Sequence, residues 1–235
     1  MERHIGFYER YIKRLLDILC ALAALIVFCW LYLIIAVLVR IKLGSPVIFK
    51  QPRPGKDEKI FNLYKFRTMT DERDENGNLL PDEVRLTKFG KALRATSLDE
   101  LPEAINILKG DMSVIGPRPQ LVRDMVFMTP EQRMRHTAKP GLSGLAQTRG
   151  RNALSWDAKL ATDLEYVQKV TFLGDVRIVF NTVKQVFFKE KGLAGSDADE
   201  IDITDDLGDY LRKAGRVSEE EFERKQAEAK ILLTK

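Results

Sequence analysis

The sequence has few of the residues that build disulfide scaffolds and histidine-based catalytic or metal sites. Its 235 residues include two cysteines and two histidines, His4 and His136. Two cysteines exclude a disulfide-stapled fold, and two histidines disfavour a zinc centre or a Ser-His-Asp triad. The sequence also lacks a Walker A loop and a GxGxxG fingerprint, so two common nucleotide-binding motifs are excluded.

The composition excludes several other classes of protein. Charged residues make up 31% of the chain and hydrophobic residues 45%, which rules out a disordered, collagen-like or coiled-coil protein. A chain of this length can bury one sizeable core. The net charge of +4 is accompanied by no nucleic-acid-reading motif, and many basic residues lie in predicted loops near an apolar run. We therefore expect no nucleic-acid partner.

One long apolar segment predicts contact with a membrane. Residues Ile18–Val39 contain no charged residue, proline or glycine, and a run longer than about 18 such residues is typical of a membrane-embedded helix. The run is too long for the core of a signal peptide. The residues that follow it, Arg40–Gly44, contain no small-residue cleavage site. We therefore expect residues 1–43 to be a membrane anchor.

Basic residues flank this anchor on both sides, whereas a single crossing has them mainly on the cytoplasmic side. This symmetry predicts a re-entrant helix that enters the inner leaflet and returns to the cytoplasm. A straight signal anchor is the alternative. The flanking basic residues are Arg3, Arg10, Lys13 and Arg14 before the run and Arg40, Lys42, Lys50 and Arg53 after it.

The remaining pattern predicts a mostly α fold with a small β element, of the α+β class. We expect a cytosolic catalytic core over residues 44–192, followed by an acidic linker and a C-terminal helix over residues 193–235. Ser218 has the spacing of an N-cap for that last helix. The amphipathic segment 174–190 suits either a membrane interface or a core-facing helix. Strands are expected at 45–49 and 60–69, a turn at 51–55, and helices at 84–95, 98–109, 120–136, 156–169 and 174–190.

An acidic pair near the middle of the chain has two interpretations. Ser97 and Glu100 have capping-box spacing, so Asp99 and Glu100 are explained by a well-capped helix alone. The alternative is chemical. A helix N-terminus would favour the ionised form of Asp99 beside a phosphate, where it can attack phosphorus, and Glu100 would hold a divalent cation.

Two further segments suit phosphate binding. Prolines on both sides of Arg118 in Gly116–Pro119 restrict the backbone, and a guanidinium suits bidentate phosphate contact. The glycine-punctuated basic stretch 139–152 is suited to a nucleoside diphosphate. By contrast, Glu72–Glu83 matches an EF-hand calcium loop except at its first position. We disfavour a calcium site there because a strand-like segment precedes it.

Seven short blocks occur in order after the apolar run. Together they resemble the bacterial sugar transferases, the monotopic polyprenyl-phosphate phosphoglycosyl transferases, over about Arg10–Lys191. Within that family the short chain and its DERDENG block are most similar to enzymes that load phospho-bacillosamine onto undecaprenyl phosphate. The blocks are YKFRTM at 64–69, DERDENG at 71–77, LDELP at 98–102, KGDMS at 109–113, GPRP at 116–119, PGLSG at 140–144 and GRN at 150–152.

The resemblance implies a two-step reaction at the cytoplasmic face of the bacterial inner membrane. Asp99 would attack the β-phosphorus of a UDP-sugar and release UMP, and undecaprenyl phosphate would then accept the phospho-sugar. Glu100 would be the partner of Mg²⁺. The partners implied are the UDP-sugar, undecaprenyl phosphate, membrane lipid and downstream glycosyltransferases. The implied substrate-binding residues are Lys65, Arg94, Arg118, Gln147 and Arg151.

Two features depart from the family pattern. The family's anchor is usually broken by Ser-Pro near its middle, whereas Cys29-Trp30 follows Phe28 here and the run has no proline. Without a breaker a straight crossing becomes easier. The resemblance also leaves the acidic tail unexplained. Two other functions stay open: a membrane-tethered lipid-phosphate-binding scaffold that does not need Asp99, and a one-step metal-dependent transferase without a covalent intermediate.

Overall fold

The computed structural model describes residues 3–150, 154–187 and 206–234. It is mostly helical with two small two-stranded sheets, which confirms the predicted α+β class. The strands are β1 (Ile48–Pro54), β2 (Ile60–Phe66), β3 (Ser113–Ile115) and β4 (Gly141–Ser143). The helical elements are η1 (Tyr8–Ile12), α1 (Lys13–Val27), α2 (Cys29–Lys42), η2 (Lys56–Glu58), α3 (Asp82–Arg85), α4 (Lys88–Ala95), η3 (Leu98–Glu100), α5 (Glu103–Lys109), α6 (Val122–Met125), α7 (Pro130–Arg133), η4 (Met134–Thr137), α8 (Leu145–Arg149), α9 (Trp156–Gln168), α10 (Phe172–Phe187), α11 (Leu207–Lys213) and α12 (Glu219–Leu233).

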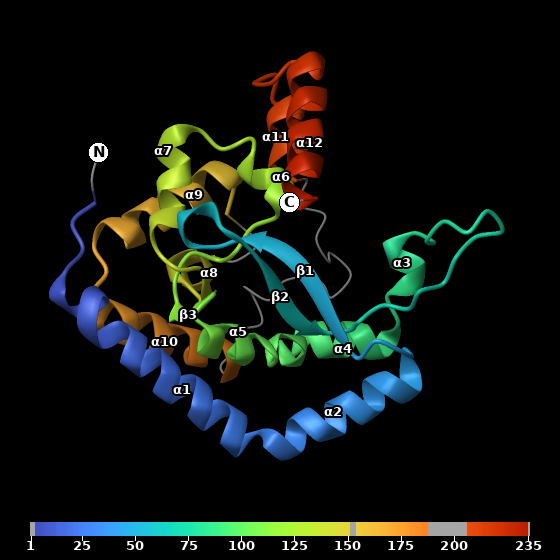
Figure 1. The fold of residues 1–235 in the computed structure, drawn as a ribbon, viewed down its shortest axis with the longest axis horizontal. Helices are drawn as coiled ribbons and strands as arrows, with labels where there is room; N and C mark the ends of the chain where they lie inside the picture. Colours follow the sequence, from blue (N-terminus) through green and yellow to red (C-terminus); the bar gives the residue numbers. More distant parts are fainter. Residues whose placement is uncertain (1–2, 151–153, 188–205, 235) are drawn as a thin grey trace.

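The apolar N-terminal segment is a bent pair of helices along one edge of the molecule (Figure 1). The axes of Tyr8–Val27 and Cys29–Lys42 differ by 65°, and the bend falls at Phe28. Within the described residues no single helix is long and apolar enough to span a bilayer, although this bent pair meets that test when taken together. The lack of a proline therefore does not produce a straight helix.

Packing on the inner side of the two arms accounts for the bend. On α1, Ala21 packs with Leu63 of β2 and Ile107 of α5. On α2, Ile35 and Val39 pack in a different cluster with residues of β2 and α4. Each arm thus buries its own face, and one straight helix would fit only one of these clusters. The outer faces of the arms expose large apolar side chains, among them Leu15, Leu19, Ile26, Trp30, Leu33 and Ile41.

The first sheet is an antiparallel ribbon of β1 and β2, in which Gln51 pairs with Leu63. The expected strand 60–69 is present but ends at Phe66. The expected strand 45–49 is wrong in extent, because β1 runs through the segment predicted to be a turn. Pro52 and Pro54 are tolerated there because a two-stranded ribbon leaves alternate N–H groups outside the ladder.

Helices α9 and α10 confirm two of the expected helices, whereas the other three are interrupted. Segment 84–95 is split because the Thr87 hydroxyl accepts from the N–H of Gly90 and begins α4 anew. Segment 98–109 is split at Pro102, between η3 and α5. Segment 120–136 is split because Pro130, capped by Thr129, begins α7.

The second sheet holds two distant loops together. Strands β3 and β4 are parallel, and Ile115 pairs with Ser143. Glycine is required where the loops around this sheet cross. A Cβ on Gly116 would lie 2.3 Å from the Lys139 carbonyl oxygen, and one on Gly141 would lie 2.0 Å from the Gly116 nitrogen. This close approach places Arg118 directly after a fixed backbone crossing.

The C-terminal helices pack on the side of the molecule away from α1 and α2 (Figure 1). Leu207 of α11 and Ala229 of α12 share a buried cluster with Phe127, Trp156 and Leu160. The Ser218 hydroxyl accepts from the N–H of Glu221, as its capping position predicts. The described part of the acidic tail thus belongs to a common core with α6 and α9.

Candidate active site

The acidic pair lies in a tight turn rather than at the start of a capped helix. Asp99 and Glu100 belong to the 3₁₀ turn η3, and α5 begins only after Pro102. Ser97, the expected cap, has a left-handed backbone with φ of +55° and makes no side-chain capping bond. The capping-box prediction is therefore wrong. A non-glycine residue held in this region is strained, and such strain tends to cluster at functional sites.

Asp99 is a buried residue close to three cations. Its exposed fraction is 7%, and within the described residues its carboxylate has no hydrogen-bond or ion-pair partner. Burial raises the pKa of Asp99, and the charge of Glu100 adds to this, whereas Lys65, Arg94 and Arg118 act to lower it. The expectation that a helix N-terminus would favour the ionised form is also wrong, because burial outweighs the cations. The result is a poorly solvated carboxyl group facing three positive charges.

Glu100, in contrast, is held firmly in its ionised form. Its Oε1 accepts from Lys65 Nζ at 2.8 Å and from Arg118 Nη2 at 2.7 Å. Burial acts to raise the pKa of Glu100, but the charges and hydrogen bonds of Arg118 and Lys65 outweigh it and hold the pKa well below its usual range. Glu100 therefore fixes the position of both cations beside Asp99.

A third carboxyl group, which the sequence analysis did not single out, completes this cluster. Glu103 lies on the first turn of α5, and its Oε1 is 3.4 Å from Lys65 Nζ. Burial and the neighbouring Glu100 raise the pKa of Glu103 to about 7. Lys65 thus bridges Glu100, which is ionised, and Glu103, which changes charge near neutral pH.

Arg94 and Arg118 approach the turn from different elements. Arg94 lies in the last turn of α4, and its Nε donates to Thr68 Oγ1 at 3.0 Å. The Arg118 loop is anchored through its backbone, since Arg135 Nη2 donates to the Arg118 carbonyl at 2.6 Å. Arg135 is itself buried and bonded to Asp163 Oδ2 through Nε at 3.0 Å and Nη2 at 2.7 Å.

The structure brings together five of the seven predicted site residues: Lys65, Arg94, Asp99, Glu100 and Arg118. Gln147 lies on α8, and its Nε2 donates to the Leu142 carbonyl at 3.3 Å. Among the described residues no hydrogen bond joins Gln147 to the acidic turn, and its Oε1 is buried without a partner. Arg151 lies outside the described residues.

His136 is buried beside Arg135. Burial and the charges of Arg135 and Arg133 lower the pKa of His136 to about 3, so it is neutral at physiological pH. Among the described residues no group of three or more His, Cys, Asp or Glu side chains is arranged to hold a metal ion. In the calcium-loop look-alike, Asp74 instead accepts from the backbone N–H groups of Asn76 and Asn78.

Two supporting contacts could not be found from motifs. For the Arg135–Asp163 pair the sequence does contain a signal. Asp163 lies between Leu160 and Val167 on the buried face of α9, and a buried charged residue needs a partner. The bond from the Tyr32 hydroxyl to the Leu101 carbonyl had no signal in the sequence. It ties the bent anchor helix to the turn that carries Asp99.

Comparisons with known proteins identify the family of this chain. A family model described as bacterial sugar transferase matches residues 8–189. The chain is 51% identical over 179 residues to EpsL of Bacillus subtilis, an uncharacterized sugar transferase, which covers 76% of this chain and 89% of that protein. It is 38% identical to the UDP-N-acetylgalactosamine-undecaprenyl-phosphate N-acetylgalactosaminephosphotransferase of Aeromonas hydrophila, over 75% of this chain and 44% of that protein. It is 34% identical to the undecaprenyl-phosphate galactose phosphotransferase of Salmonella typhimurium, over 77% of this chain and 42% of that protein. The chain therefore belongs to the bacterial sugar transferase family.

Proposed function

We propose that this enzyme transfers a sugar 1-phosphate from a UDP-sugar to undecaprenyl phosphate and releases UMP. The names of the Aeromonas and Salmonella relatives support undecaprenyl phosphate as the acceptor. The observation that carries the proposal is Asp99, a buried residue beside three cations whose carboxyl group has no hydrogen-bond partner among the described residues. A structural carboxylate at this burial would be hydrogen-bonded or paired.

In the first step, a carboxylate oxygen of Asp99 attacks the β-phosphorus of the UDP-sugar. A bond forms between this oxygen and the β-phosphorus, and the bond from the β-phosphorus to the bridging oxygen breaks. UMP leaves with that oxygen and its electron pair, and the sugar phosphate stays on Asp99 as an acyl phosphate. In the second step, a phosphate oxygen of undecaprenyl phosphate attacks the same phosphorus and restores the Asp99 carboxylate.

The cations around the turn suit this chemistry. Phosphoryl transfer depends on the positioning of the reactants and on stabilisation of charge on the phosphate oxygens. Lys65 and Arg118 are held in place by Glu100, and Arg94 by Thr68, so that they are ordered before the substrate arrives. No described residue donates a hydrogen bond to the Asp99 carboxylate, so its oxygens are available as nucleophiles.

We propose Glu100 as the protein ligand of Mg²⁺. Mg²⁺ in phosphoryl-transfer sites is bound by one or two carboxylates together with substrate phosphates, so a cluster of three protein ligands is not required. The low pKa of Glu100 keeps it ionised as a ligand, and Asp99 lies next to it. When bound, the ion would neutralise charge on the diphosphate.

The anchor and α10 suit a place at the inner leaflet, with the site on the cytoplasmic face. The outer faces of the bent pair and one side of α10 expose large apolar residues, including Leu173 and Phe180 at 77% and 68%. We propose that the bent pair enters the leaflet and returns, with α10 in the interface. The Tyr32–Leu101 bond would then set the depth of the Asp99 turn relative to the lipid phosphates.

The test is UMP release by the full chain in nanodiscs with magnesium and undecaprenyl phosphate. The donor panel includes UDP-diacetylbacillosamine, UDP-N-acetylgalactosamine, UDP-galactose and UDP-glucose. We expect release with at least one donor, and a drop of about 10³-fold or more in Asp99→Asn, since removal of a nucleophile abolishes the covalent route. The exposed Asp82→Asn on α3 is the matched control and should behave as wild type.

A single-turnover experiment separates the two-step route from its alternatives. Wild-type protein with the active UDP-sugar and no acceptor should release one UMP per site and carry a phospho-sugar adduct on Asp99. UMP release that requires the acceptor, with no adduct, would favour a one-step transferase. No release from any donor, with lipid-phosphate binding kept in Asp99→Asn, would favour the scaffold.

A further inference from the structure

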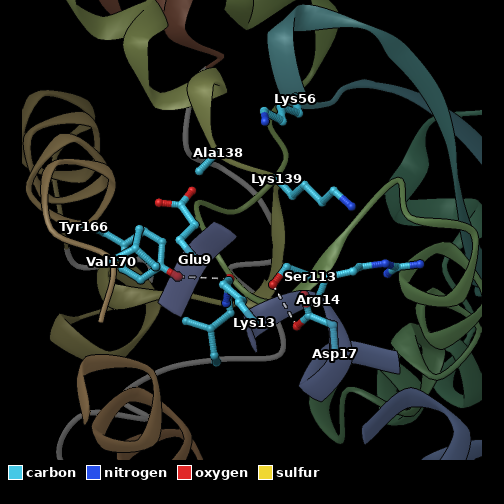
Figure 2. Close-up of a pocket in the computed structure, with 11 residues that line it drawn as sticks. Glu9, Lys13, Arg14, Asp17, Lys56, Ser113, Ala138, Lys139, Tyr166 and Val170 are labelled. Atoms are coloured by element: carbon cyan, nitrogen blue, oxygen red, sulfur yellow. Dashed lines mark hydrogen bonds between the residues drawn. The ribbon is translucent and has the colours of Figure 1, made fainter. Parts of the chain in front are cut away.

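A cavity of about 90 Å³ lies apart from the Asp99 turn, against the N-terminal part of the anchor (Figure 2). The first helical turns of the anchor form one wall, and β3, the segment leading into β4 and the end of α9 form the others. None of Lys65, Arg94, Asp99, Glu100 or Arg118 lines it. The lining residues are Glu9, Lys13, Arg14, Asp17, Lys56, Ser113, Ile115, Ala138, Lys139, Tyr166 and Val170.

The carboxylates in this wall are already used by the protein. Asp17 Oδ1 accepts from Ser113 Oγ and from the N–H of Val114, each at 2.9 Å. Glu9 pairs with Arg3. The ammonium of Lys13 is likewise used, since it lies 2.6 Å from Asp175 Oδ2. Among the described residues, therefore, no carboxylate of the cavity lies within ion-pair distance of the other cations that line it.

Three cations remain around the cavity. Among the residues that the structure describes, Arg14 donates only to backbone carbonyls, those of Ile107 and Leu108 at the end of α5. Within the described residues neither Lys56 nor Lys139 has a hydrogen-bond or ion-pair partner. Figure 2 shows Arg14 and Lys139 extending to the same side of the cavity. A Cβ on Gly110 would lie 3.4 Å from Arg14 Nη2 and 3.6 Å from Lys139 Nζ.

We propose that this cavity is a second anion site, which binds one phosphate group through Lys139, Lys56 and Arg14. Pockets for larger ligands typically have volumes of about 300–1,000 Å³, and this cavity is much smaller. A whole sugar nucleotide therefore does not fit in it, whereas a single tetrahedral oxyanion fits. Burial lowers the pKa of Lys139, and the like charges of Arg14 and Lys56 lower it further, whereas Asp17 and Asp111 act to raise it.

The site lies at the opposite end of α5 from the acidic turn. Glu103 begins this helix beside Lys65, and Arg14 binds the carbonyls at its other end. The phosphate has two possible sources, a lipid headgroup at the surface that the anchor enters or a free phosphate from the cytosol. Both present the same oxyanion, and the experiment below separates them.

The experiment counts inorganic phosphate bound per chain by equilibrium dialysis of the full-length protein in a non-ionic detergent. We expect two phosphates, one of which depends on Arg118 and rests on the proposed function, whereas the other does not. The double variant Lys56→Gln/Lys139→Gln should lose one phosphate, with affinity at that site reduced about tenfold or more because two charged donors are removed. Arg118→Ala should lose the other.

The controls separate a binding site from general charge effects and from misfolding. The exposed Lys230→Gln on α12 removes a charge elsewhere and should bind as wild type does. Lys139→Arg keeps the charge and should retain the phosphate. An unchanged count in the double lysine variant overturns the proposal, whatever Arg118→Ala shows. A missing Arg118-dependent phosphate instead counts against the proposed function alone.

A lipid arm identifies the source. The same count is made in nanodiscs of phosphatidylcholine and in nanodiscs that contain phosphatidylglycerol. If anionic lipid occupies the site, phosphatidylglycerol should remove the lysine-dependent phosphate and leave the Arg118-dependent one. An equal count in both bilayers would assign the site to free phosphate. Either result supports a second anion site, provided that the lysine-dependent phosphate is present in detergent.

Discussion

At the residue scale, three carboxyl groups within five positions have different ionisation. Asp99 is buried and has no hydrogen-bond partner in the described part of the chain, and burial raises its pKa. Glu100 is bonded to two cations, which hold its pKa low against the effect of burial. Glu103 is buried beside Glu100, and its pKa is raised to about 7. Two like charges this close cannot both ionise at low cost, so the proton is carried by the group with the weaker cationic partners.

Replacement of Glu103 by glutamine should change how stability depends on pH. The pKa of Glu103 is about 7 in the folded chain against 4.5 for an unperturbed glutamate, so the folded state binds the extra proton between these values. Its contribution to stability is present below pH 4.5 and is lost as the pH rises through 7. We expect the Tm of wild type to fall between pH 5 and pH 8 relative to that of Glu103→Gln.

Thermal unfolding in detergent across this pH range measures the difference. Glu131→Gln, at an exposed position on α7, is the control and should run parallel to wild type. Parallel curves for wild type and Glu103→Gln would show that Glu103 ionises at an ordinary pH in the folded chain. Glu103 would then be ionised at neutral pH, and its contact with Lys65 would be an ordinary ion pair.

The sequence predicted which residues the structure brings together better than it predicted their surroundings. Asp99, Glu100 and Arg118 were found because they lie in short blocks with family spacing. The capping interpretation of Ser97 failed because local spacing does not report that the backbone turns left-handed there. Glu103 and Arg135 were missed because their role comes from contacts with residues far away in the sequence, Lys65 and Asp163. The periodicity of one segment can show that a residue such as Asp163 is buried, but it does not show which residue is its partner.

At the element scale, the helices found correctly are α9 and α10, whose apolar pattern is uninterrupted, and α12, whose start the Ser218 cap marks. The interrupted ones show where a local stop signal outweighs periodicity. Thr87 and Thr129 cap new helices, and Pro130 cannot continue an existing one. The bend at Phe28 is a different case. It has no local signal such as proline, and it follows from the packing of α1 and α2 against different clusters.

The bent pair predicts that both ends of the anchor lie on the same side of the membrane. Single-cysteine variants His4→Cys and Lys50→Cys, made after replacement of Cys20 and Cys29, place exposed thiols before and after it. We expect an impermeant maleimide to label both in inverted vesicles and neither in intact cells whose outer membrane has been permeabilised or is absent. Mass tagging of the thiol after each treatment gives the labelled fraction.

A third variant fixes the side of the catalytic unit in the same assay. Asp82→Cys lies on α3, well exposed and outside the anchor. It should follow Lys50→Cys in both preparations. If His4→Cys were labelled from the outside while Asp82→Cys was labelled from the inside, the anchor would cross the bilayer and the re-entrant arrangement would be wrong.

At the scale of the whole molecule, the chain has two sides of different character. The bent pair and α10 expose large apolar side chains, whereas α11 and α12 lie away from them and carry many charges (Figure 1). The α+β class was predictable because it follows from the sum of local patterns. The packing of the tail on α6 and α9 was not, because the apolar residues of 206–234 do not show locally which part of the core they contact.

This packing makes the tail part of the folded core, although the family match ends at residue 189. Leu207 is 1% exposed, and its N–H donates to Asp124 Oδ1 at 3.0 Å. Leu207→Ala should therefore destabilise the chain by about 2–5 kcal/mol through lost burial and the cavity left behind. The backbone hydrogen bond to Asp124 is kept in this variant, so the change in unfolding free energy reports the loss of side-chain packing.

Chemical denaturation in detergent, followed by tryptophan fluorescence, reports this loss because Trp156 lies in the same cluster. Ile231→Ala on α12 removes an apolar side chain that is 58% exposed and should change the midpoint little. UMP release below the unfolding transition should be near wild type in both variants, because neither residue contacts the Asp99 turn. An unchanged midpoint in Leu207→Ala would mean that the tail folds and unfolds apart from the catalytic unit. The tail would then be an appendage in energetic terms, even though its side chains share the core in the structure.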